Sequence, residues 1–176
     1  MSSLRVLAVA VFVAALLVAS PVAAQQPPAN PLDTVPAVMP FDIPYGAPIT
    51  LERAQAAIHA AVSEAAKHNW KLNVAVYDSG ANLVAFQRMD GAQLASIKVS
   101  EHKARVAVLY RRETKVFEGG IQSGFNYLIT LDDVIASRGG IPLVVGGKLI
   151  GAIGCSGGTG SQDEVACKAG AAVINK

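Results

Sequence analysis

A glycine-rich stretch near the end of the chain, residues 138–164, constrains the fold more than any other segment. It reads Arg-Gly-Gly-Ile-Pro-Leu-Val-Val-Gly-Gly-Lys-Leu-Ile-Gly-Ala-Ile-Gly-Cys-Ser-Gly-Gly-Thr-Gly-Ser-Gln-Asp-Glu. Two β-prone runs, 141–145 and 148–155, flank Gly146 and Gly147, a pair that suits a tight turn with positive φ. The stretch therefore predicts a β-hairpin, and two strands joined in this way must be antiparallel.

The second strand of this hairpin and the loop after it are rich in glycine, which leaves space for another group to approach the backbone. Gly151 and Gly154 lack side chains, so another backbone or a ligand can approach the strand closely. The loop 156–162 is rich in glycine, and its backbone amides come just before a helix that we expect to begin at Asp163. A close contact at this strand and an amide-rich loop are thus the first two structural expectations.

The hydrophobic pattern of the rest of the domain predicts further helices and a second hairpin. Apolar residues recur at helical spacing after Thr50, which is a good N-cap. The expected elements are a helix over 51–67, strands over 72–78 and 83–88, a helix over 94–110, an irregular segment over 118–126 and a last helix over 163–175. The order helix, hairpin, helix, hairpin, helix predicts a mixed α/β (α+β) fold with an antiparallel sheet.

The first 24 residues have the pattern of a secretory signal peptide. Arg5 supplies the positive end, residues 6–18 are apolar, and Val-Ala-Ala at 22–24 suits cleavage by its small residues. The apolar run is short for a bilayer span, which needs about 20 residues. We therefore expect a periplasmic or secreted protein with no stable membrane span after cleavage.

The next segment, 25–49, carries seven of the nine prolines and is expected to be an extended arm. Its apolar side chains can dock on the domain or on a neighbouring subunit; they are Phe41, Ile43, Tyr45 and Ile49. Residues 50–176 then form a single domain. The formal net charge of +2 gives no reason to expect nucleic acid or acidic lipid as a partner.

The two cysteines of an exported chain raise the question of a disulfide. Cys155 ends a predicted strand and Cys167 lies in the helix that follows, so the chain doubles back between them. A disulfide is our first interpretation. The alternatives are two small buried side chains, or Cys155 as a thiolate ligand of a metal or haem.

Three motifs, taken in order, resemble the GlcG/HbpS-like family of haem-utilisation and glycolate-operon proteins. They are Val76–Gly91 followed by Ala92, then Lys98–Ala107, then the glycine-rich stretch 138–164. Each motif is short, but their order and spacing over the whole domain are specific. The resemblance, which extends to PduO-type haem-binding domains, implies a five-stranded antiparallel sheet flanked by helices, assembly into homo-oligomers, and haem as a cofactor.

His102 is the candidate haem ligand, because of its place on the central helix. It shares a stripe with four apolar residues, Ala95, Val99, Val106 and Leu109. Lys98, Arg105 and Arg112 lie seven apart on another stripe, with Glu101 within reach of the first two. An imidazole for iron, apolar groups for the macrocycle and cations for the propionates would suit haem. The alternative is a half-buried histidine that hydrogen-bonds a backbone carbonyl.

We predict a ligand pocket for haem or a small anion from three segments of the chain, either within one subunit or at a subunit interface. Its residues are His102, Lys103, Arg105, Arg138, Gly139, Gly140, Ser156, Gly157 and Gly158. Arg138 would hold an anionic group or pair with Asp132 or Asp133. The amides of the loop would cradle a carboxylate, or the loop is simply a connection.

Several catalytic motifs are excluded. The run from Gly154 to Gly158 formally matches the nucleophile elbow G-x-S-x-G, but that motif needs a helix directly after Ser156 and a later histidine. No histidine follows His102. The loop also lacks the Lys-Ser/Thr ending of a P-loop and the spacing of a dinucleotide fingerprint. Glu64 and His68 have i, i+4 spacing, but two ligands do not make a metal site.

Three functions remain. The first is an exported haem-binding protein that senses, stores or slowly degrades haem. The second is an enzyme or accessory protein acting on a short organic acid, although no acid–base or nucleophile set is evident. The third is a structural homo-oligomer.

Overall fold

The computed structural model describes residues 33–39 and 41–176 of the chain. The predicted signal peptide and the start of the arm lie outside the described residues. Residues 38–176 form one compact unit, and the exposed residues 33–37 belong to another. None of the helices in the described ranges has the length and apolar character needed to cross a bilayer.

The domain contains four α-helices, one 3-10 helix and four strands within the described residues. In chain order they are α1 (Leu51–Lys67), β1 (Asn73–Asp78), β2 (Leu83–Arg88), α2 (Ala95–Leu109), α3 (Lys115–Gln122), η2 (Asn126–Thr130), β3 (Gly140–Val145), β4 (Lys148–Ser156) and α4 (Gly160–Ala172). The two hairpins and the first, second and last helices match the elements expected from the sequence.

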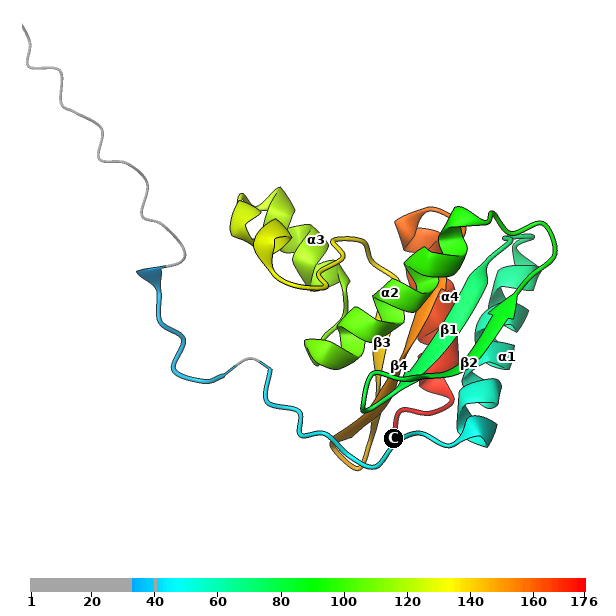
Figure 1. Cartoon of the computed structure of the whole chain (residues 1–176), viewed down its shortest axis with the longest axis horizontal. Coiled ribbons are helices and arrows are strands. Elements are labelled where there is room, and N and C mark those ends of the chain that lie inside the picture. Colours follow the sequence, from blue (N-terminus) through cyan, green and yellow to red (C-terminus); the bar gives the residue numbers. More distant parts are fainter. Residues whose placement is uncertain (1–32, 40) are drawn as a thin grey trace, which may run out of the picture. The chain divides into compact units, whose positions relative to one another are not determined.

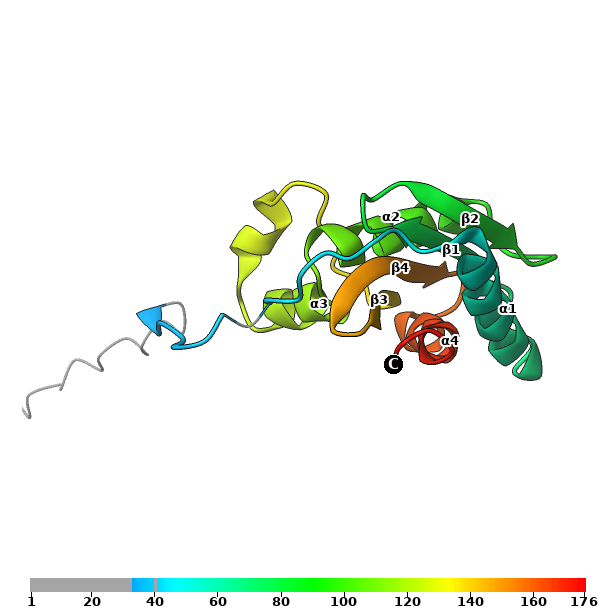
Figure 2. The same cartoon turned by 90° about the horizontal axis from the view of Figure 1, so that it is seen from below.

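The strands form one antiparallel sheet in the order β2-β1-β4-β3. Helix α2 lies across one face, while α1 and α4 cover the other, so the sheet is a central layer (Figures 1 and 2). Strand β4 is in the middle and is buried from Leu149 to Ser156. The fold is therefore α+β, as predicted, but the expected five-stranded sheet has four strands in the described part of the chain.

The arm occupies the place where a fifth strand would begin. Strand β1 stops opposite Gly151, so the start of β4 has no partner on that side. There Tyr45 makes an isolated parallel bridge with Leu149, and the Ile49 amide donates to the Ile150 carbonyl over 2.8 Å. The arm thus docks on its own domain through this short contact, which is too brief to count as a strand.

The glycines of β4 allow the close approach that the sequence indicated. A Cβ on Gly154 would lie 2.2 Å from the Ser100 carbonyl oxygen of α2, and one on Gly151 would lie 2.3 Å from the Tyr77 carbonyl oxygen. What approaches β4 at both positions is therefore the protein's own backbone. Helix α2 packs directly on the sheet through small residues such as Ser100 and Ala104, both fully buried.

The prediction of an irregular segment over 118–126 was wrong, because α3 occupies its first part. Two glycines cost this helix roughly 1 kcal/mol each. Phe117 compensates, since it is 1 % exposed and meets Tyr110 edge-on with ring centroids 5.1 Å apart. Burial of such a side chain contributes about 1.5–3 kcal/mol. Tertiary packing thus outweighs local propensity here.

The last helix begins earlier than Asp163, the residue at which we expected it. Thr159 is the N-cap, and its side chain accepts from the Gln162 amide. The Gln162 side chain reaches back to the Thr159 amide, which completes a capping box. Asp163 therefore lies inside the first turn and is free to point toward the sheet rather than cap the helix.

Candidate functional site

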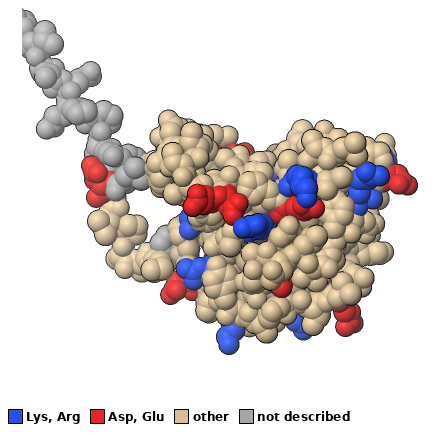
Figure 3. All heavy atoms as spheres, in the orientation of Figure 1, with Lys and Arg blue, Asp and Glu red and all other residues tan. Residues whose placement is uncertain are grey.

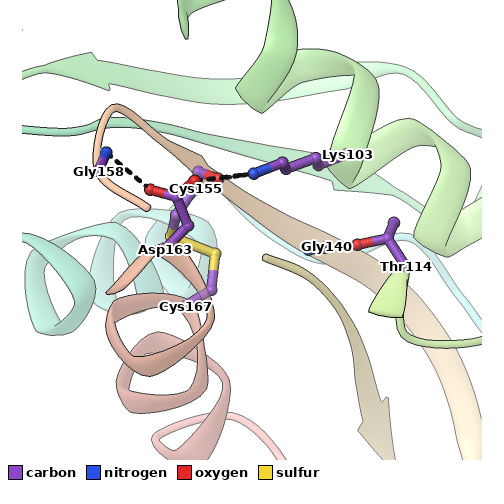
Figure 4. The surroundings of a disulfide bond; sticks show 7 residues. All are labelled: Lys103, Thr114, Gly140, Cys155, Gly158, Asp163 and Cys167. Carbon is purple, nitrogen blue, oxygen red and sulfur yellow. Dashed lines mark hydrogen bonds and ion pairs between the residues drawn. A yellow bond between two sulfur atoms is a disulfide. The ribbon is translucent and has the colours of Figure 1, made fainter. Parts of the chain in front are cut away.

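The disulfide predicted between Cys155 and Cys167 is present. The Cα atoms are 5.6 Å apart, and both residues are fully buried. The bond fastens the end of β4 to α4 (Figure 4). Because both sulfur atoms are used, Cys155 is not available as a thiolate ligand.

Lys103 lies beside this disulfide, on the side of α2 that faces the sheet. Its Nζ donates to Asp163 Oδ2 over 2.8 Å and to the Cys155 carbonyl over 3.2 Å (Figure 4). The two side chains are 1 % and 3 % exposed. Burial raises the pKa of Asp163 above its ordinary value, although Lys103 opposes that shift. Lys103 is therefore a buried structural cation whose charge is already compensated.

Gly139 and Gly140, just before and at the first position of β3, make room for Lys103 and its partners. Gly139 has φ +111°, and a Cβ there would lie 2.9 Å from the Asp163 side chain. A Cβ on Gly140 would lie 2.3 Å from the Lys103 carbonyl oxygen. Thr114 fixes this position, since its hydroxyl accepts from the Gly140 amide over 2.9 Å. The space beside both glycines is thus filled by the protein itself.

The end of β4 and the loop after it, residues 156–158, likewise make their contacts with other parts of the domain. Ser156 is buried, and a Cβ on Gly157 would lie 2.3 Å from the Lys71 carbonyl oxygen. The Gly158 amide donates to Asp163 Oδ1 over 3.0 Å. The carboxylate that this loop cradles is therefore that of Asp163.

Arg138 lies at the surface among acidic side chains other than those expected. Its guanidinium is 2.9 Å from Glu118 Oε1 and 3.4 Å from Glu164 Oε2, so the pairing with Asp132 or Asp133 was wrong. Hydrogen bonds from Arg138 hold the pKa of Glu118 below its usual value. Both carboxylates compete with any anion that would bind this arginine.

His102 and Arg105 lie together on the outer side of α2, separate from the surroundings of Lys103. They line a surface cavity of about 310 Å³, here called the outer pocket, whose lining is Tyr77, Lys98, Glu101, His102, Arg105 and Asp133. Arg105 Nη2 is 3.0 Å from Asp133 Oδ2, and Lys98 Nζ is 2.8 Å from Glu101 Oε2. The structure thus divides the predicted pocket into a buried part and an exposed part.

The imidazole of His102 is oriented by a backbone group. His102 is half-buried, and its Nε2 lies 2.9 Å from the Asp133 carbonyl oxygen. A carbonyl only accepts hydrogen bonds, so Nε2 carries the proton and the lone pair of neutral His102 is on Nδ1. This is the hydrogen bond expected of an ordinary half-buried histidine. It is also the support that metal-binding histidines commonly have.

Apolar surface continues along α2 on either side of His102. Ala95 and Leu109 are exposed, and Val99 is half-buried, whereas Val106 is fully buried. Over the face drawn in Figure 3, charges of both signs lie close together without a large patch of one sign. The outer side of α2 therefore combines one imidazole, two cations and a partly exposed apolar strip.

The donor set limits what the outer pocket can bind. Within the described residues no group of three or more His, Cys, Asp or Glu side chains could hold a metal ion. Glu64 and His68 are 3.2 Å apart but form only a pair. A single histidine is a poor site for a bare metal ion, yet it would be sufficient for haem, because the porphyrin itself supplies four nitrogen ligands to the iron. The residues present thus fit haem better than a free metal ion.

Sequence reasoning missed Tyr77 and Asp133 as members of this pocket. Tyr77 lies on β1, within the first of the three family-like motifs (Val76–Gly91), and burial raises the pKa of its hydroxyl. Asp133 follows η2 and has φ +57°, unusual for a residue other than glycine. Its place beside α2 depends on the course of the loop, which no local pattern encodes.

Residues 49–172 match the family model described as "Haem degrading protein HbpS-like". Protein GlcG of Escherichia coli strain K12 is 42% identical over 108 residues, which cover 61% of this chain and 81% of that protein. Both findings agree with the resemblance drawn from the three sequence motifs.

Solved structures share the fold. A double mutant of Streptomyces reticuli HbpS is 29% identical, covers 81% of this chain and 98% of that one, and has a TM-score of 0.69. The PduOC:heme complex is 26% identical, covers 73% of this chain and 96% of that one, and has a TM-score of 0.66.

Proposed function

Because this chain belongs to the HbpS-like family of haem-degrading proteins, we propose that it binds haem on the outer side of α2. The observation that carries the proposal is the orientation of His102: its Nε2 hydrogen-bonds the Asp133 carbonyl, and its Nδ1 lone pair accepts no hydrogen bond from a described residue. The haem complex of the related PduOC domain supports haem as the ligand.

Each component of the outer pocket has a role in this proposal. His102 would hold the iron, and the apolar strip formed by Ala95, Val99 and Leu109 would contact the macrocycle. Lys98 and Arg105 would meet the propionates, once they exchange their present carboxylate partners. Bound haem would supply the redox chemistry for its own degradation, whereas this chain supplies binding and orientation. Sensing, storage and slow degradation are all consistent with such a site.

A haemin titration followed by absorbance tests the proposal. We expect a saturable spectral shift with the purified protein and its loss in His102→Ala. His59→Ala is the matched control, because His59 is exposed on α1, and it should bind as the unmodified protein does. A shift retained in His102→Ala would move the ligand elsewhere. Absence of a saturable shift in the unmodified protein would refute haem binding.

We also propose that the protein is exported to the periplasm or secreted. The buried disulfide supports this, since disulfides persist in oxidising compartments. Mass spectrometry of the protein from its native compartment should find a chain that begins after Ala24 and has no free thiol. A chain that retains its first 24 residues, or has two reduced cysteines, would contradict export.

A further inference from the structure

A second cavity lies away from the outer pocket, between the end of α2, helix α3 and η2. It measures about 350 Å³, and its lining is Phe41, Arg112, Val116, Phe117, Gly119, Gly120, Ser123, Phe125, Tyr127 and Leu128. Four aromatic rings and two aliphatic side chains make most of its wall apolar. A concave, mostly apolar cavity of this size with a charged anchor is typical of small-molecule sites.

Among the described residues that line this cavity, Arg112 alone is charged. Its Cζ lies 3.1 Å from the centroid of the Phe41 ring and 5.4 Å from that of Phe117. Its Nε donates to the Tyr110 carbonyl over 2.9 Å, and its two terminal nitrogens make no hydrogen bond to a described residue. Most of the donors of this guanidinium therefore remain available.

Arg112 also differs from the three cations of the predicted pocket. Lys103, Arg105 and Arg138 each pair with a carboxylate. Across residues 33–39 and 41–176, no carboxylate lies within ion-pair distance of Arg112. The remaining residues, 1–32 and 40, contain no Asp or Glu. Burial lowers the pKa of Arg112, but a guanidinium stays charged at neutral pH.

We propose that this cavity binds a small monocarboxylate with an aromatic or short aliphatic body. The carboxylate pairs with the terminal nitrogens of Arg112, in the bidentate geometry that guanidinium groups favour. The body of the ligand packs against the rings of Phe125 and Tyr127 and the exposed side chain of Val116. This site is independent of the proposed haem site, because the two cavities share no lining residue.

Calorimetric titration of the full chain with benzoate and hexanoate tests the proposal, and benzamide is the uncharged comparison. We expect at least one of the two acids to bind saturably. If benzoate binds, benzamide should bind at least about ten-fold more weakly than benzoate does. Arg112→Gln should weaken the acid by about ten-fold or more, since a charge-assisted hydrogen bond is lost. His102→Ala should bind the acid as the unmodified protein does.

Gly119 offers a second variant that does not alter the arginine. An added Cβ at this position of α3 would meet no other atom within 4 Å. Gly119→Leu should fill the cavity and abolish binding, whereas Gly119→Ala, the matched control, should preserve it. Both variants must unfold cooperatively, as the unmodified protein does, for the comparison to be made.

Three results would overturn the proposal. They are no saturable binding of either acid, equal binding of benzoate and benzamide, or binding that survives both Arg112→Gln and Gly119→Leu. A negative haemin titration would leave it standing, because that experiment concerns the outer pocket alone.

Discussion

Two ion pairs made by neighbouring residues of α2 have similar geometry and very different surroundings. Lys103 Nζ lies 2.8 Å from Asp163, and Arg105 Nη2 lies 3.0 Å from Asp133. The side chains of the first pair are 1 % and 3 % exposed, while those of the second are 48 % and 43 % exposed. Burial, rather than distance, therefore decides what each pair does.

The inner pair holds α2, β4 and α4 together. Asp163 accepts from both Lys103 and the Gly158 amide, and Lys103 also reaches the Cys155 carbonyl. The outer pair instead surrounds His102, and both of its members can turn toward water. One side of the helix thus carries a buried structural pair, and the other side carries the residues of the proposed haem site.

The largest effect is expected from breaking the inner pair. Lys103→Met keeps most of the side-chain volume but leaves the Asp163 carboxylate buried and uncompensated. The free energy of unfolding should fall by about 3–5 kcal/mol, the usual cost of removing one member of a buried pair. Urea denaturation followed by circular dichroism measures this. A loss below about 1 kcal/mol would show that water or a neighbouring group replaces the lysine.

The pH dependence of this variant follows from Asp163. Its pKa in the folded protein lies above the ordinary value of 3.8 because burial outweighs Lys103. Between those two pKa values the folded state binds more protons than the unfolded state, so stability falls as pH rises through that window. Without Lys103 the folded pKa rises further and the window widens upward. The loss should therefore be greater near pH 7 than near pH 4.

The double variant Lys103→Met, Asp163→Leu is the control for this interpretation. With both charges removed, no buried carboxylate remains to be neutralised, so part of the lost stability should return. The extra pH dependence of the single variant should disappear. If the double variant is as pH-dependent as Lys103→Met, another group is responsible.

Much of the fold follows from local features of the sequence. The two glycines at 146 and 147 specify the hairpin, and Thr50 caps α1 as expected. The spacing of Cys155 and Cys167 on a strand and the following helix was sufficient to suggest the disulfide. Each of these features depends on residues close together in the chain.

The division of the predicted pocket could not be read from the sequence. Helical spacing shows which residues share a side of α2, but not which side meets the sheet. The apolar stripe with His102 suggested one side, whereas the sheet packs against small residues such as Ser100 and Ala104, because Gly154 permits close contact. Lys103 then faces inward, and its partner Asp163 lies 60 residues away in the chain.

The smallest effect on stability is expected from breaking the outer pair of Arg105 and Asp133. Asp133→Asn removes the charge while keeping a residue type that tolerates φ +57°. Because both partners are about half exposed, the free energy of unfolding should change by less than about 1 kcal/mol. A double-mutant cycle with Arg105→Gln, measured by urea denaturation, gives the coupling between the two side chains. A coupling above about 2 kcal/mol would mean that the Asp133 loop is held as firmly as the inner pair, and that His102 lies in a structural site rather than in one open to a ligand.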